Sequence, residues 1–234
     1  EFVWTGIDYL GEPTPYGGSA HRRLTPRKDE HYSRSSYFGI CDLCALPKDR
    51  FYLYRAHWNR EAFTLHLVPH HWNFPDKAGK KMPVYVYTSA DEAELFLNGV
   101  SLGRRRKQPN AGTVTAGTKP GADYYSVMPR YRLIWEDVPY APGELKTVAY
   151  GKDGRTLGEQ AIRTAGAPAR VVLTPERRYG RLCVVVVTLV DEKGAFVPNE
   201  SRRVRFAAEN CEILAVGNSN PRGFDSFKDV SSHP

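Results

Sequence analysis

Apolar and polar residues alternate most clearly between residues 63 and 166, and this alternation predicts β-strands. Apolar or β-branched residues recur at every second position in three successive runs, a spacing that places them on one face of an extended strand. The three runs are Leu65 and Leu67, then Val84, Val86 and Thr88, then Leu95 and Leu97. Residues 131–135 and 146–150 predict two later strands. Residues 63–166 are therefore predicted to form a β-domain.

Turn residues separate these predicted strands and indicate that they are antiparallel. Asn98-Gly99 lies between two apolar runs, and this dipeptide favours a tight hairpin because both of its residues tolerate positive φ. Pro142-Gly143 and Asp153-Gly154 mark two further turns. Residues 63–166 are thus predicted to form one antiparallel β-sandwich of immunoglobulin type.

The pattern before residue 63 is different and predicts the last strand, loop and helix of a βα unit in residues 1–62. A short apolar run at 2–4 opens into a segment rich in Gly, Pro and acidic residues, as a buried strand does when it ends in a loop. Pro47 is predicted to occupy the first position of a helix. Phe51, Tyr54 and Trp58 follow at helical spacing and share one face.

A second β-domain is predicted over residues 167–234, after a linker at 165–168. Its expected strands are 170–173, 182–190, 203–207 and 212–216, with a hairpin turn at 192–194. Immunoglobulin-like domains usually need about 100 residues and seven strands. We therefore expect this second sandwich to be incomplete.

The net charge of +7 and the pI near 9.2 raise the question of nucleic-acid binding. The basic runs are scattered over all three predicted domains, which favours solvated loops instead. They are Arg22-Arg23, Arg104 to Lys107, Arg177-Arg178 and Arg202-Arg203. Residues 104–128 are predicted to form a long basic insertion. No run of 18 apolar residues occurs, so no membrane span is predicted.

Cysteines and histidines offer little metal-binding chemistry. Cys41 and Cys44 have the spacing of a metal-binding pair, but no second pair completes the site. They are predicted to be small buried residues, and Cys183 and Cys211 are left as either free thiols or a disulfide. His57, His66, His70 and His71 are expected to pack and form hydrogen bonds. No metal or cofactor is predicted.

Three long stretches resemble the C-terminal part of bacterial glycoside hydrolase family 2 β-galactosidases. They are EFVWTGIDYLGEPTPYG at 1–17, RSSYFGICDLCALPKDRFYLYRAHW at 34–58 and YTSADEAELFLNGVSLG at 87–103. The resemblance implies a mainly β chain: the terminal βα unit of a (β/α)8 barrel, an immunoglobulin-like sandwich and a truncated invasin-type sandwich. A whole barrel takes about 250 residues, so the chain is expected to be a piece of a longer polypeptide.

The same resemblance suggests one sugar-binding residue, Trp4, which would form an aromatic wall of the sugar site and be joined to Thr5 by a cis peptide bond. An indole suits the apolar C–H face of a pyranose. Both family glutamates would lie upstream of residue 1, so no catalytic residue is assigned here. Asp8 and Glu12 could pair as carboxylates, but hydrogen bonds that shape the loop are the expected role.

The function implied is that of a C-terminal fragment of an exported retaining exo-β-galactosidase, periplasmic or extracellular, acting on oligo- or polysaccharide β-galactosides. The Asn-x-Lys pair of related glucuronidases is missing, since no Asn precedes Asn59, and this favours a galactoside. The alternatives are a β-glucuronidase or β-mannosidase, and a non-catalytic carbohydrate-binding or adhesin-like module. The expected protein partner is the rest of the same polypeptide or a second copy.

Overall fold

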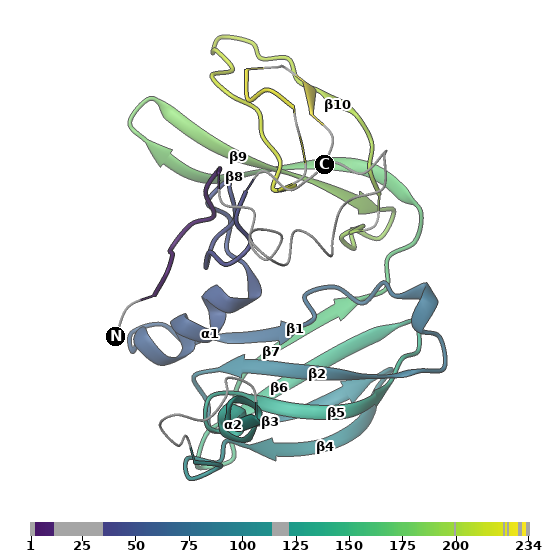
Figure 1. Ribbon diagram of the computed structural model, residues 1–234. Coiled ribbons are helices and arrows are strands. Elements are labelled where there is room, and N and C mark those ends of the chain that lie inside the picture. Colours follow the sequence, from purple (N-terminus) through teal and green to yellow (C-terminus); the bar gives the residue numbers. More distant parts are fainter. Residues whose placement is uncertain are drawn as a thin grey trace, which may run out of the picture. The chain divides into compact units, whose positions relative to one another are not determined.

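The computed structural model describes residues 3–11, 35–113, 122–198, 200–221, 223, 225–228 and 231–232. The chain divides into two compact units. One unit comprises Glu1–Phe51 together with Ser201–Pro234, and the other comprises Tyr52–Glu200. Figure 1 shows the elements, which are mainly antiparallel strands.

Seven strands of the second unit form the predicted sandwich. Their order is β1-β2-β5 in one sheet and β4-β3-β6-β7 in the other, and all pairs are antiparallel. This division of strands is that of an immunoglobulin-type fold. The strands are β1 (Leu65–Val68), β2 (Lys81–Thr88), β3 (Glu92–Leu97), β4 (Val100–Arg106), β5 (Leu133–Pro139), β6 (Glu144–Tyr150) and β7 (Thr156–Arg163).

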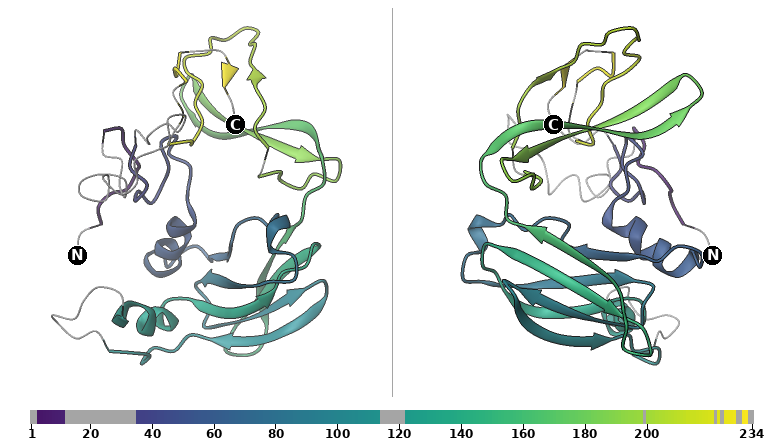
Figure 2. Two further views of the ribbon diagram at one scale, coloured as in Figure 1. Left: turned by 45° about the vertical axis from the view of Figure 1, so that its right-hand side comes forward. Right: turned by 180° about the vertical axis from the view of Figure 1, so that it is seen from behind.

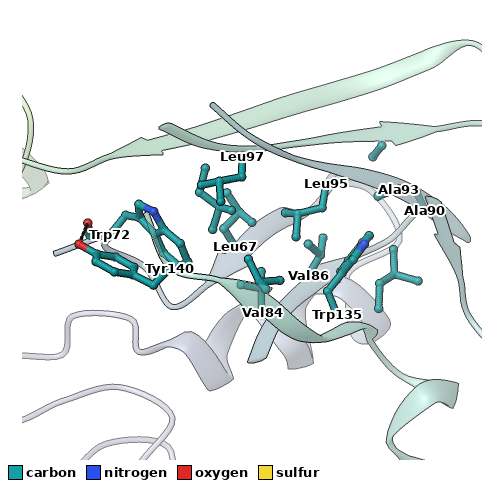
Figure 3. Close-up of a cluster of buried hydrophobic side chains, with 14 residues drawn as sticks. Leu67, Trp72, Val84, Val86, Ala90, Ala93, Leu95, Leu97, Trp135 and Tyr140 are labelled. Carbon is teal, nitrogen blue, oxygen red and sulfur yellow. Dashed lines mark hydrogen bonds between the residues drawn. The ribbon is translucent and has the colours of Figure 1, made fainter. Parts of the chain in front are cut away.

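The core of the sandwich lies between the two sheets, as Figure 3 shows. Val84 and Val86 of β2 face Leu95 and Leu97 of β3, so the alternation in the sequence corresponds to the buried faces. Trp72 closes one end of the core: its side chain is fully buried, and its indole N–H donates to the carbonyl of Ala141 at 2.9 Å. Burial of such side chains provides the main stabilisation of the fold.

The hairpin between β3 and β4 turns at Asn98 and Gly99. Both residues have positive φ, 50° and 81°, as a type I′ turn requires. The Asn98 side chain also tethers the turn to the next hairpin, because it accepts from the backbone N–H of Glu144 and donates to the carbonyl of Pro142. The predicted turns at Gly143 and Gly154 are present as well, each with positive φ.

The predicted basic insertion at 104–128 is wrong at its start. Arg104 to Arg106 continue β4, where Glu92 and Glu94 of β3 lie opposite them. Arg104 forms salt bridges of 3.2 and 3.1 Å with these two glutamates, and its guanidinium lies 3.9 Å from the centroid of the Tyr150 ring. Cross-strand charge pairs thus extend the strand beyond its apolar part. Helix α2 (Ala122–Val127) and the short 3₁₀ helix η3 (Met128–Arg130) precede β5.

Helix α1 (Asp49–Trp58) begins two residues later than predicted. Pro47 forms an isolated antiparallel bridge with Cys41, and the N–H of Lys48 donates to the carbonyl of Ile40, so the chain stays extended up to this point. Another short 3₁₀ helix, η2 (Pro75–Lys77), lies between β1 and β2. Among the described helices, none has the length and hydropathy that a bilayer crossing needs.

Strands β8 (Pro168–Tyr179) and β9 (Leu182–Asp191) form a long two-stranded ribbon, visible in green in Figure 2. Strand β8 extends beyond its predicted bounds at both ends, and β9 extends beyond them at its C-terminal end. The chain turns between the two strands at Gly180, which has positive φ. Asp191 shapes the next turn, where its Oδ1 accepts from the N–H groups of Lys193 and Ala195.

Beyond residue 200, the first unit contains only the two-residue strands β10 (Val204–Arg205) and β11 (Ser231–Ser232) in its described part. The strand predicted at 212–216 does not form. The side chain of Leu214 in this segment is exposed. The N–H of Val216, at the end of the segment, donates a hydrogen bond to the carbonyl of Phe227. An apolar run with no neighbouring strand to pair with lacks the hydrogen bonds and packing that stabilise a β-strand.

Candidate functional site

The segment that carries Trp4 is held by backbone pairing with residues 35–41. Ile7 forms a parallel bridge with Cys41, and Leu10 forms an antiparallel bridge with Ser35. In the described part of the predicted strand at 2–4, Val3 and Trp4 are not in a strand, and Phe2 lies outside the described residues. Backbone pairing therefore begins at Ile7, after the apolar run at 2–4, and the paired residues lie about thirty positions further along the chain.

Trp4 presents its indole to solvent, with 74% of the residue exposed. The indole N–H donates to the hydroxyl of Tyr9 at 3.2 Å. The Tyr9 and Phe38 rings form a T-shaped pair, with centroids 5.8 Å apart and planes at 76°. The Trp4–Thr5 peptide bond is cis, which confirms that prediction.

Asp8 is buried and holds the surrounding backbone in place. Its Oδ1 accepts from the N–H of Gly39 at 2.7 Å and from the hydroxyl of Ser36 at 3.4 Å, and its Oδ2 pairs with Lys48 Nζ at 2.5 Å. These contacts give Asp8 the loop-shaping role that was expected of it. Glu12, the other predicted carboxylate, lies outside the described residues.

Gly39 fits closely against Asp8. A Cβ at this position would clash with the backbone nitrogen of Asp8 and lie 2.7 Å from its Oδ1. A side chain there would therefore displace the segment between Trp4 and Tyr9. The tight contact explains why glycine occupies a position that the sequence pattern alone did not single out.

Cys41 and Cys44 lie in a turn built around Asp42. The Oδ1 of Asp42 accepts from the N–H groups of Cys44 and Leu46 at 2.8 and 2.9 Å. Burial raises the pKa of the Cys44 thiol, and the charge of Asp42 adds to the shift, so the thiol is held in its protonated, weakly ligating form. Cys41 and Cys44 are half-buried, Cys183 and Cys211 are exposed, and none of the four forms a disulfide.

The histidines pack against aromatic rings and form hydrogen bonds. His66 stacks on Tyr52 with ring centroids 3.8 Å apart, and His71 stacks on Phe74 at 4.5 Å. His57 Nε2 lies 2.9 Å from the carbonyl oxygen of Tyr131, and burial lowers the pKa of His57. Within the ranges that the structure describes, no three His, Cys, Asp or Glu side chains are grouped as a metal site would require.

Sequence reasoning missed the residues that hold Trp4. Tyr9, Ser36 and Phe38 lie within the stretches at 1–17 and 34–58 that carry the resemblance, but no role was assigned to them, and Ser36 and Phe38 lie about thirty positions from Trp4 in the chain. It also missed an open groove of about 370 Å³ between the edge strands β4 and β5 of the sandwich, which no periodicity indicates. Five charged residues contribute to its lining, namely Arg105, Arg106, Arg132, Glu136 and Asp137.

Two curated relatives match nearly the whole chain. β-Galactosidase BoGH2A of Bacteroides ovatus is 39% identical over 98% of this chain and 23% of its own length. A putative β-glucuronidase of Formosa agariphila is 30% identical over 94% of this chain and 19% of its own length. The chain thus spans about a fifth of the length of these relatives. A family model described as a domain of unknown function, DUF4982, matches residues 79–158.

Two solved structures match the fold as well. A β-glycosidase from Bacteroides vulgatus is 29% identical with a TM-score of 0.74, covering 100% of this chain and 26% of that one. A glycosyl hydrolase family 2 member from Bacteroides cellulosilyticus is 31% identical with a TM-score of 0.65, covering 85% of this chain and 27% of that one. This chain is homologous to the C-terminal part of glycoside hydrolase family 2 enzymes.

Proposed function

We propose that this chain is the C-terminal part of a retaining exo-β-galactosidase and that Trp4 lines the pocket for its terminal sugar. The observation that carries the proposal is the exposed indole of Trp4, fixed by Tyr9, in a chain that is 39% identical to a β-galactosidase over nearly its whole length. An indole face held toward solvent suits the apolar face of a pyranose.

In this proposal, residues 1–62 complete a (β/α)8 barrel whose other strands carry the two catalytic carboxylates. A retaining glycosidase uses one carboxyl group as nucleophile and the other as acid and base, about 5 to 5.5 Å apart. Asp8 takes no part in this chemistry, because Gly39, Ser36 and Lys48 already engage its carboxylate. The sandwich at 63–166 and the β-domain at 167–234 support the barrel, and the enzyme acts in the periplasm or outside the cell.

The test uses the full-length protein with matched nitrophenyl β-galactoside and β-glucuronide. We expect the galactoside to be hydrolysed with the higher kcat/KM and the first sugar product to keep the β configuration, as followed by proton NMR. Trp4→Ala should raise KM at least tenfold. A higher kcat/KM for the glucuronide would show that the enzyme is a β-glucuronidase instead. A first product in the α configuration would rule out a retaining mechanism.

A β-glucuronidase is the second candidate, because a putative β-glucuronidase is also similar over 94% of the chain. The Asn-x-Lys pair of related glucuronidases has no counterpart here, since no Asn precedes Asn59, and this favours the galactosidase. A full-length protein that binds oligosaccharide but hydrolyses neither substrate would instead support a binding module.

A further inference from the structure

We propose that Tyr9 is the positioning residue of the sugar site: its hydroxyl holds the indole of Trp4 in the orientation that presents the ring face to substrate. The inference rests on the proposed function, because it assigns Tyr9 a role through Trp4. It concerns the geometry of the pocket wall and leaves the chemical step to residues elsewhere.

The starting point is the conformational freedom of the Trp4 side chain. A tryptophan can adopt several staggered rotamers, so a directional contact is needed to select the one that turns the ring face toward substrate. The indole N–H of Trp4 has the hydroxyl of Tyr9 as its acceptor, at 3.2 Å. This contact fixes the polar edge of the ring and leaves its apolar face open.

Tyr9 can act as an anchor because it is held on several sides. Its backbone N–H donates to the hydroxyl of Ser36 at 3.1 Å, and its carbonyl accepts from the N–H of Ser36 at 2.9 Å. The edge contact with Phe38 fixes the plane of the phenol ring. The hydroxyl that receives the indole N–H is therefore placed by the 35–41 segment.

The anchor extends to the start of α1 through buried polar contacts. Ser36 donates to Asp8, and Asp8 pairs with Lys48, whose Nζ also donates to the carbonyl of Tyr37 at 3.0 Å. Polar contacts thus link Lys48 to the backbone of Tyr9, and the Tyr9 side chain carries the link on to the indole of Trp4. An arrangement of this kind preorganises a binding wall, so that less side-chain freedom is lost when the sugar binds.

The test is a double-mutant cycle in the full-length protein with Tyr9→Phe and Trp4→Phe. Phenylalanine at position 9 keeps the ring against Phe38 and removes only the acceptor. We expect Tyr9→Phe to raise KM for an aryl β-galactoside about three- to tenfold with kcat changed less than twofold. Because Tyr9 acts through Trp4, the same change in a Trp4→Phe background should add almost nothing.

Tyr179→Phe is the matched control, since it removes the same hydroxyl from an exposed tyrosine of β8, and KM should not change. A second readout is independent of hydrolysis: in ¹H–¹⁵N spectra, Tyr9→Phe should move the Trp4 indole N–H resonance upfield as its hydrogen bond is lost. The resonance is assigned from Trp4→Phe.

Additive effects in the cycle, or an indole resonance that stays in place, would overturn the positioning role even if the enzyme is a galactosidase. If the wild-type protein hydrolyses no galactoside, or Trp4→Phe leaves KM unchanged, the proposed function fails instead. The indole resonance then still decides whether Tyr9 orients Trp4.

Discussion

The sandwich formed by β1 to β7 and the segment around Trp4 are stabilised in opposite ways. The sandwich buries a continuous set of apolar side chains between two sheets. The Trp4 segment instead depends on polar contacts, with Asp8 and Ser36 buried at its centre and Trp4 exposed at its surface. Apolar burial determines whether a domain folds, whereas directional hydrogen bonds determine where one side chain points. The comparison teaches that the site needs its polar scaffold for geometry more than for stability.

The largest effect is expected from Leu95→Ala in β3. Leu95 is fully buried, and the truncation should lower the free energy of unfolding by about 2–5 kcal/mol because it leaves a cavity. Urea unfolding measures the change. Leu157→Ala in β7, where the side chain is 46% exposed, is the control and should change stability by less than about 1 kcal/mol. Equal losses in the two variants would refute the assigned core.

A smaller effect is expected from Asp8→Asn, and it should be confined to the Trp4 segment. The change removes the charge that Lys48 pairs with and weakens the bond from Gly39, at a cost of about 1–3 kcal/mol. Hydrogen exchange at the Gly39 amide should speed up while amides of β3 stay protected.

Asp76→Asn is the control for that change, because the ion pair of Asp76 with Lys77 is exposed and 3.6 Å long. Exposed pairs contribute at most about 1 kcal/mol, so exchange at Gly39 should not respond. Unaltered exchange in Asp8→Asn itself would mean that the buried carboxylate does not hold the segment.

Gly99→Ala should cost about 1 kcal/mol, since the backbone there has a φ of 81° and a Cβ disfavours that conformation. No clash with neighbouring atoms adds to the cost, because no atom lies within 4 Å of the added Cβ. Thermal unfolding detects the loss. The neighbouring change Val100→Ala, at a 65% exposed position, should be close to neutral, and a larger loss there would argue against a tight turn.

The smallest expected effect is a change in acid sensitivity through Asp191. Hydrogen bonds from the N–H of Gly166, and next from that of Ala195, lower the pKa of Asp191 below its ordinary value of 3.8. As pH falls, the Asp191 carboxylate is protonated in the unfolded chain before it is protonated in the folded protein. Its contribution to stability is therefore full above pH 3.8 and is lost as pH falls through the lower pKa of the folded state.

Asp191→Asn should remove that dependence, giving a flatter decline of stability below pH 3.8 than in the wild type. Urea titrations at a series of acidic pH values make the measurement. Parallel curves for the two proteins would show that Asp191 does not contribute to acid unfolding.

The sandwich could be predicted from the sequence because its determinants are local. The alternation of Val84, Val86 and Thr88 marks the buried face of β2, and Asn98-Gly99 fixes the hairpin of β3 and β4. Where local signals were charged, prediction failed: Arg104 suggested a loop, but Glu92 and Glu94 opposite it keep the strand in place. Such a cross-strand partner is invisible until the register is known.

The site could be predicted only in part. Resemblance singled out Trp4 and its cis peptide bond, but nothing local indicated that Tyr9 would receive the indole N–H or that Ser36 would join Asp8 to Tyr9. The contacts of Ser36 link positions about thirty residues apart, and that of Trp4 with Tyr9 links positions five apart, each through single polar atoms. Neither hydrophobic periodicity nor turn chemistry records contacts of that kind.

The arginines of β4 have a consequence for solubility. Strand β4 is an edge of its sheet, and its open side could in principle recruit a strand from another molecule. Any such strand would have to strip water from the exposed guanidinium groups of Arg104, Arg105 and Arg106. The run of basic residues therefore guards the protein against edge-to-edge aggregation.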